Sequence, residues 1–154
     1  LVGAGASITS MASSEIYSAM QTGVLDAANT SSSSFVSYRI FEQVACYTPA
    51  ADIALWFLYQ PLLMNKSTFD GLSAEQQTAL LAAAEKAEEH YREQAKLQDA
   101  ASVEVFEKAG VEIAQMTAED FAAWQALAQE TSYAAFVADV PGGQELLDMA
   151  LAVE

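Results

Sequence analysis

Residues 73–110 show the hydrophobic periodicity of an amphipathic α-helix. Ser73 opens the segment with a capping box, in which Gln76 occupies the third helical position. No glycine or proline follows until Gly110, which is a natural helix terminator. The apolar stripe consists of Leu80, Ala84, Ala87, Tyr91, Ala95, Val103 and Phe106. We therefore predict one long helix over about 74–109, which would measure roughly 54 Å at a rise of about 1.5 Å per residue.

A helix of this length is too long for one small domain. A compact domain of 154 residues is roughly 40 Å across, so the helix would extend beyond it. It could kink, pair as a coiled coil or run across a second lobe. The stripe is rich in alanine and irregular for a heptad repeat, which favours the second lobe. Because the sequence begins Leu1-Val2-Gly3, with no initiator methionine or signal peptide, we interpret it as a C-terminal portion whose N-terminal lobe is largely missing.

Shorter periodic segments occupy the rest of the chain. Ser13 or Ser14 can cap a helix that ends near Gly23, with Glu15 in its first turn. The other patterns predict a loop or short strand over 1–12, strands over 24–28, 53–64 and 111–116, and helices over about 33–46, 117–137 and 144–153. Together these elements indicate an α/β fold.

The charge balance excludes several classes of partner. The chain has 21 acidic and 6 basic residues, for a net charge of −15. Binding to nucleic acid or to an anionic membrane surface needs clustered cations, so neither is expected. The longest apolar run, Ile53 to Leu58, is too short to span a bilayer, so no direct membrane insertion is expected. Cys46 is the single cysteine and is expected to be a small buried hydrophobic residue.

The sequence contains no pattern that indicates catalysis. His90 is the single histidine and lies in the middle of the predicted long helix, without a second histidine or cysteine for a metal site. No nucleophile-elbow sequence and no phosphate-binding glycine loop is present. We therefore expect no enzyme activity, no metal-ligating residues in this chain and no cofactor; the sequence does not specify whether a metal ion binds together with a ligand. The polar run from Asn29 to Ser34, near an aromatic strand, is suited to a small polar ligand or to ordinary capping and packing.

The segment Ser14–Asp26 resembles the signature of the solute-binding proteins of tripartite ATP-independent periplasmic (TRAP) transporters. The matching positions are Glu15, Tyr17, Ala19, Gln21, Gly23 and Asp26. The likeness continues through Leu62–Asn65, the helix capped by Ser73, and Gly110-Val111. It implies the C-terminal part of a two-lobed periplasmic receptor with a long lobe-spanning helix. It also implies capture of a small organic acid in the cleft between the lobes, lobe closure, and delivery to TRAP membrane permease subunits.

The resemblance also points to ligand-binding positions. They are Ser13, Asn29, Thr30, Ser31, Trp56, Tyr59 and Gln60. Ser13 has an alternative role as a helix N-cap, and Trp56 could be plain core. The family often has an Asn-Pro pair after the aspartate; here Asn29 stands one place early, Thr30 occupies the matching place and Ser31 replaces the proline.

The cation expected to bind the ligand carboxylate is not part of this sequence. The resemblance places the family's carboxylate-binding arginine upstream of Leu1, and Arg39 is expected at the surface. The alternative interpretation of the whole chain is a non-catalytic acidic α/β interaction module that uses the long helix for oligomerisation.

Overall fold

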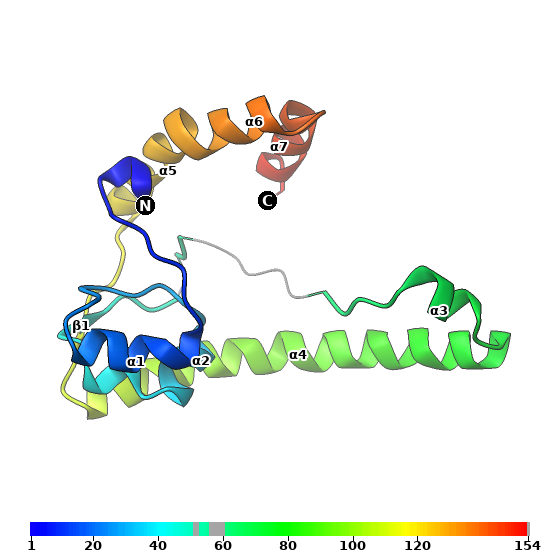
Figure 1. Cartoon of the computed structure of the whole chain (residues 1–154), viewed down its shortest axis with the longest axis horizontal. Helices are drawn as coiled ribbons and strands as arrows, with labels where there is room; N and C mark the ends of the chain where they lie inside the picture. The colour runs from blue at the N-terminus through cyan, green and yellow to red at the C-terminus, as the bar shows by residue number, and fades with distance from the viewer. Residues whose placement is uncertain (51–52, 56–60, 154) are drawn as a thin grey trace. The chain divides into compact units, whose positions relative to one another are not determined.

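The computed structural model describes residues 1–50, 53–55 and 61–153 (Figure 1). The chain divides into two compact units. One unit comprises Leu1–Met11 and Met116–Glu154, and the other comprises Ala12–Gln115. The larger unit contains α1 to α4 and both strands of the described sheet.

Helix α4 dominates the larger unit and spans Ala74–Lys108, against the predicted 74–109. The hydroxyl of Ser73 accepts a hydrogen bond from the backbone N–H of Gln76 at 3.2 Å, and the side-chain oxygen of Gln76 accepts the N–H of Ser73 at 2.9 Å. These two bonds satisfy donors that the first turn would otherwise leave unpaired. The chain leaves the helix at Gly110, whose φ of 79° suits glycine.

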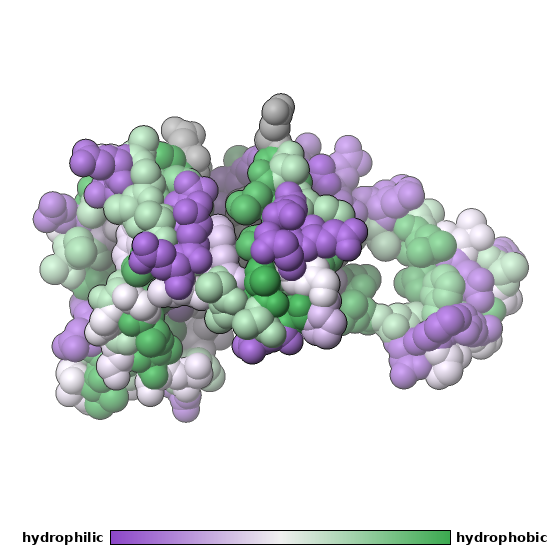
Figure 2. All heavy atoms as spheres, turned by 90° about the horizontal axis from the view of Figure 1, so that it is seen from above, coloured by the Kyte–Doolittle hydropathy of each residue, from purple (hydrophilic) through white to green (hydrophobic). Residues whose placement is uncertain are grey.

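Within the described chain, the fully buried side chains of α4 lie near its C-terminal end. Its buried residues are Ser102 and Phe106. Farther toward the N-terminus, Leu81 is 57% exposed and Leu97 is 61% exposed. Figure 2 shows hydrophobic and hydrophilic residues side by side on the face that it presents. Within the predicted apolar stripe, Phe106 is buried, Ala87 and Tyr91 are exposed, and the other members are half-buried: Leu80, Ala84, Ala95 and Val103.

The core of the larger unit forms around the covered end of α4. Tyr47, Phe106 and Val111 are buried there, with five partly buried neighbours: Phe35, Val36, Phe41, Val44 and Ile113. The rings of Tyr47 and Phe106 stack with centroids 4.0 Å apart, and Phe35 meets the ring of Tyr47 edge-on at 5.6 Å. The Tyr47 hydroxyl and Ser102 Oγ lie 3.0 Å apart and form a buried hydrogen bond. This packing fixes helix α2 against the end of α4 (Figure 1).

Strand β1 (Cys46–Tyr47) pairs in parallel with β2 (Glu112–Ile113). Cys46 is opposite Glu112, and Tyr47 is opposite Ile113. The predicted strand over 111–116 is therefore shorter than expected. Cys46 is exposed, so the expectation that it is buried was wrong: its side chain points away from the face that buries Tyr47.

The predicted strand over 24–28 is absent, and the C-terminus of α1 explains the difference. Helix α1 spans Ser13–Gln21, and Gly23 takes a φ of 72°. The backbone N–H groups of Val24 and Leu25 then turn back to the carbonyl oxygen of Ala19, at 2.8 and 3.2 Å. Donors that a strand would need are used to cap the helix.

The single helix predicted over 33–46 is also wrong. Helix α2 spans Ser32–Ser37, a 3-10 turn η2 spans Ile40–Glu42, and β1 follows. Arg39 separates the two helical pieces because its φ is 56°, in the left-handed region. A short helix α3 (Lys66–Asp70), capped by Asn65, was not predicted. Residues 56–60 of the strand predicted over 53–64 lie outside the described residues, and residues 53–55 and 61–64 are not strand.

The smaller unit is helical. It contains η1 (Val2–Ala4), α5 (Ala118–Ala128), a π-helical segment η3 (Gln129–Tyr133), α6 (Ala134–Asp139) and α7 (Gly143–Leu151). The helices predicted over 117–137 and 144–153 correspond to α5–α6 and α7. Turn η1 lies beside α5 (Figure 1), and a Cβ atom on Gly3 would approach Thr131 Cγ2 to 2.8 Å. Glycine at position 3 permits this close packing.

Candidate functional site

Two of the predicted ligand-binding residues meet in the larger unit. Ser13 Oγ and Thr30 Oγ1 lie 3.1 Å apart and form a hydrogen bond between half-buried side chains. Ser13 lies at the start of α1, and Thr30 lies in the segment that leads into α2. The hydroxyl pair therefore links the start of α1 to the segment before α2, through two residues that are 17 positions apart in the sequence.

The start of α1 leaves Ser13 available for this contact. One of Ser13 and Ser14 was predicted to be the N-cap of α1, and this prediction was wrong. The N-cap is Ala12, because its backbone N–H donates to Glu15 Oε2 at 3.2 Å and its carbonyl accepts the N–H of Glu15 at 2.9 Å. Ser13 is then the first helical residue, and its side chain reaches Thr30 instead of capping.

The remaining predicted positions differ in their surroundings. Ser31 is the N-cap of α2: its Oγ accepts the backbone N–H of Ser34 at 3.2 Å and donates to Ser34 Oγ at 2.9 Å. The Ser31 side chain thus serves local capping. Asn29 is exposed. The predicted positions Trp56, Tyr59 and Gln60 lie outside the described residues.

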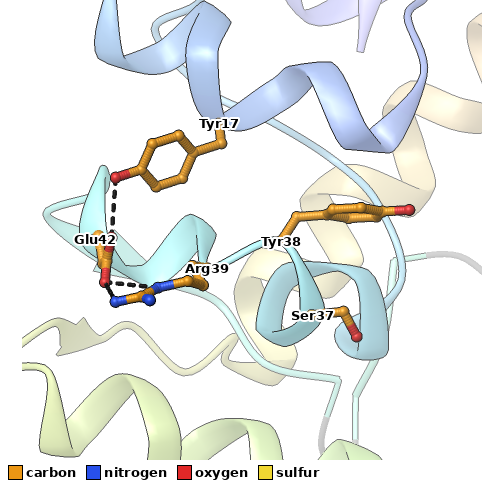
Figure 3. Close-up of a pocket in the computed structure, with 5 residues that line it drawn as sticks. All are labelled: Tyr17, Ser37, Tyr38, Arg39 and Glu42. Carbon is orange, nitrogen blue, oxygen red and sulfur yellow. Dashed lines mark hydrogen bonds and ion pairs between the residues drawn. The ribbon is translucent and has the colours of Figure 1, made fainter.

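A second polar arrangement was not predicted as a site. Five residues line an open hollow of about 360 Å³ in the larger unit: Tyr17, Ser37, Tyr38, Arg39 and Glu42 (Figure 3). Figure 3 shows the side chains of Tyr17 and Arg39 directed toward Glu42, whereas the Tyr38 hydroxyl points away. The three-residue spacing of Arg39 and Glu42 was the sequence signal for this ion pair.

Glu42 is the centre of this second cluster. Its Oε2 accepts the Tyr17 hydroxyl at 2.9 Å, and its Oε1 accepts Arg39 Nε at 2.9 Å and a second guanidinium nitrogen. Hydrogen bonds from Arg39 and then from Tyr17 lower the pKa of Glu42, and partial desolvation opposes them weakly. Arg39 is at the surface, as expected, with a side chain that is 68% exposed. Its charge is already paired with a carboxylate.

These two arrangements can bind by hydrogen bonding but contain no catalytic constellation. The Ser13–Thr30 pair offers neutral donors and acceptors, and His90 is exposed on α4. Among the residues that the structure describes, no group of three or more His, Cys, Asp or Glu side chains could hold a metal ion. In the same residues, no helix combines the length and the apolar character needed to cross a bilayer.

Comparisons with known proteins all point to the same family. Residues 3–139 match the family described as "Bacterial extracellular solute-binding protein, family 7". A solute-binding protein of Albidiferax ferrireducens is 37% identical over 147 residues, which are 96% of this chain and 44% of that protein. The 2,3-diketo-L-gulonate-binding periplasmic protein of Escherichia coli is 32% identical over 145 residues, which are 93% of this chain and 42% of that protein.

Two further relatives extend the comparison. The C4-dicarboxylate-binding periplasmic protein of Rhodobacter capsulatus is 30% identical over 116 residues, which are 75% of this chain and 34% of that protein. The crystal structure of a TRAP periplasmic solute-binding protein from Rhodoferax ferrireducens with bound malonate superposes with a TM-score of 0.88 at 35% identity. That match covers 100% of this chain and 51% of the solved chain. The chain thus spans about half the length of the relatives it matches or less.

Proposed function

Because the chain belongs to family 7 of the bacterial extracellular solute-binding proteins, the binding proteins of TRAP transporters, we propose that it forms part of a receptor that captures a small organic acid and delivers it to TRAP membrane permease subunits. The observation that carries the proposal is the similarity over the whole chain to a solved TRAP binding protein that holds malonate. The family consists of binding proteins and not of enzymes, so capture is proposed to occur without chemical change to the acid.

The Ser13–Thr30 hydroxyl pair is the part of this chain that we assign to the acid. Both side chains are half-buried, and both belong to segments that flank the family signature. A hydroxyl can donate a hydrogen bond to a ligand oxygen or accept one from a ligand hydroxyl. Asn29 is exposed next to Thr30 and is proposed to contact the acid as well. Ser31 supports the segment through its cap on α2. Trp56, Tyr59 and Gln60 remain proposed contacts on the basis of the resemblance.

The exposed apolar residues of α4 support a two-lobed receptor. A helix of 35 residues with buried side chains only near its C-terminus presents apolar residues such as Leu81 and Leu97 to solvent. Leu62 and Leu63 are each 85% exposed. We propose that a second lobe, outside the 154 residues, covers these side chains and supplies the cation that binds the carboxylate. The acid would then lie between two lobes that close around it, as in other hinge-closing receptors.

The test is ligand-dependent stabilisation of the full-length protein that contains this chain. A ligand that binds only the folded state at 100 times its Kd stabilises that state by about 2.7 kcal/mol, which raises Tm measurably. We expect at least one member of a panel of small mono- and dicarboxylates to raise Tm, while the corresponding primary alcohols and amides do not. A panel in which no acid changes Tm, even at millimolar concentration, would contradict the proposed function.

The family does not by itself fix the class of acid. The names of two relatives refer to a dicarboxylate in one case and to a keto- and hydroxyl-bearing monocarboxylate in the other. The class of acid that this receptor binds therefore has to be determined by experiment on the receptor itself.

A further inference from the structure

We propose that Tyr17 and Glu42 are positioning residues for the acid, because their hydrogen bond holds α1 at the rotation that brings the hydroxyl pair together. The inference rests on the proposed function, since the hydroxyl pair is the part of the chain assigned there to the acid. Tyr17 belongs to the signature segment, but it was not predicted as a ligand contact. Its role as a link between α1 and the chain after α2 follows from the geometry of the larger unit.

Helix α1 is tied to the segments on both sides of α2 by two hydrogen bonds. At its first residue, Ser13 Oγ lies 3.1 Å from Oγ1 of Thr30, the residue directly before the N-cap of α2. One turn later, the Tyr17 hydroxyl donates to Glu42 Oε2 at 2.9 Å, in the η2 turn that follows α2. Ser13 and Tyr17 are four positions apart, so they lie on the same face of α1. A rotation of α1 that breaks one of these bonds therefore moves the side chain that makes the other.

The Glu42 end of this link is well supported. Arg39 donates to Glu42 Oε1 from Nε at 2.9 Å and from a second guanidinium nitrogen, and Figure 3 shows Arg39 and Tyr17 both directed toward the carboxylate. Next to Glu42, the ring of Phe41 meets that of Phe106 edge-on, with centroids 6.0 Å apart. Glu42 is thus fixed to the core of the larger unit, and its bond to Tyr17 extends that support to α1.

The hydroxyl pair needs this support because its own hydrogen bond is long. The oxygen atoms of such bonds are commonly about 2.5–3.0 Å apart. The distance between Ser13 Oγ and Thr30 Oγ1 is 3.1 Å, so a small further displacement of α1 separates the two hydroxyls. An acid that binds both hydroxyls would then lose one of its contacts. The bond between Tyr17 and Glu42 therefore affects the affinity for the acid without touching it.

A double-mutant cycle in the full-length receptor tests the inference, with Kd measured by calorimetry at neutral pH. The probe is the acid that binds the native receptor most tightly among malonate, succinate, lactate, threonate and the other members of the carboxylate panel. Tyr17→Phe keeps the ring and removes an exposed hydrogen bond, so the variant should remain folded. We expect its Kd to be weaker than that of the native receptor by about threefold or more. In a Thr30→Val background, where the pair is already broken, the same substitution should weaken Kd by less than about 1.5-fold.

Tyr38→Phe is the matched control for the loss of a tyrosine hydroxyl. Tyr38 lines the same hollow, but its hydroxyl points away from Glu42 in Figure 3, so the variant should bind the acid as the native receptor does. Glu42→Ala removes the acceptor for Tyr17 and should weaken binding as much as Tyr17→Phe does. Glu42→Gln keeps a side-chain oxygen that can accept the Tyr17 hydroxyl, so it should recover most of the affinity lost in Glu42→Ala.

Three results overturn the inference and leave the receptor function intact. The first is an acid that binds Tyr17→Phe as tightly as the native receptor. The second is an equal loss from Tyr17→Phe in the native and Thr30→Val backgrounds, which would mean that the bond acts independently of the hydroxyl pair. The third is a Glu42→Gln variant as weak as Glu42→Ala. If no acid of the panel binds the native receptor, the proposed function is overturned and the inference with it.

Discussion

The ring of Tyr47 stacks on the ring of Phe106, with centroids 4.0 Å apart and planes inclined by 24°. This contact joins β1 to the C-terminal end of α4. Phe35 meets both rings edge-on, with centroids 5.6 and 6.2 Å away, and it lies five positions after Thr30. The aromatic cluster therefore holds the segment that carries the candidate ligand-binding hydroxyl.

Phe106→Ala should destabilise the receptor strongly. Phe106 is 1% exposed and contacts three aromatic rings, so the substitution removes buried area and leaves a cavity. We expect a loss of about 3–5 kcal/mol in the free energy of unfolding, measured by chemical denaturation of the full-length protein. Phe106→Leu should cost clearly less, because it keeps most of the apolar volume. A loss below about 1 kcal/mol for the alanine variant would mean that the cluster is not a core.

Tyr47→Phe tests the buried hydrogen bond in the same cluster. The variant removes the hydroxyl that bonds Ser102 Oγ at 3.0 Å, while Ser102 still donates to the carbonyl of Asp99 at 2.7 Å. Because no buried donor is left unsatisfied, the cost should be about 1 kcal/mol. The double variant with Ser102→Ala should cost less than the sum of the two single variants. Fully additive losses would show that the two hydroxyls do not interact.

Glu42 should make folding stability depend on pH in the acidic range. Its pKa lies below the ordinary value of 4.5, first through the hydrogen bond from Arg39 and second through that from Tyr17. A carboxylate with a depressed pKa in the folded state contributes stability above its unfolded-state pKa and loses that contribution as the pH falls through the folded-state value. The difference in stability between the native protein and Glu42→Gln should therefore be present at neutral pH and disappear in strong acid.

Denaturation of both proteins at several pH values measures this difference. Arg39→Ala should raise the pKa of Glu42 toward its ordinary value, and Tyr17→Phe should do so by a smaller amount. A Glu42→Gln effect that is independent of pH would contradict the proposed origin of the shift.

Leu97→Glu tests whether α4 is covered in the complete receptor. Leu97 is 61% exposed within this chain, and the proposed second lobe would bury it. A charge placed in that interface should lower the stability of the full-length protein by about 2 kcal/mol or more. Gln98→Glu on the adjacent, exposed position should change stability little. If Leu97→Glu leaves stability unchanged but dissociates a dimer in light scattering, the surface around Leu97 serves oligomerisation instead.

The features that could be predicted from sequence are those with local signals. The capping box at Ser73 and the glycine at position 110 bound α4 closely, because both act within one helical turn. The family resemblance seen in Ser14–Asp26 is confirmed by the match over residues 3–139 and by the solved relative. With it, the prediction of a periplasmic binding protein and not an enzyme is confirmed at the level of the family.

The features that were missed depend on backbone conformation or on distant contacts. The left-handed conformation of Arg39 divides a helix that periodicity alone predicted to be continuous. The pairing of Cys46 with Glu112 joins positions that are far apart in the sequence, and no local pattern specifies it. Ser13 and Thr30 were each predicted as ligand contacts, but their mutual hydrogen bond depends on how α1 and α2 pack.

The affinity of Thr30 variants for the tightest-binding acid tests the central claim most directly. Thr30→Val removes the hydroxyl and keeps the shape, whereas Thr30→Ser keeps the hydroxyl. Calorimetry on the full-length receptor should show about a five- to tenfold weaker Kd for Thr30→Val, the cost of about one hydrogen bond, and a change within about twofold for Thr30→Ser and for Ser14→Ala as an exposed control. If Thr30→Val binds the acid as tightly as the native protein, the hydroxyl pair is not part of the ligand site.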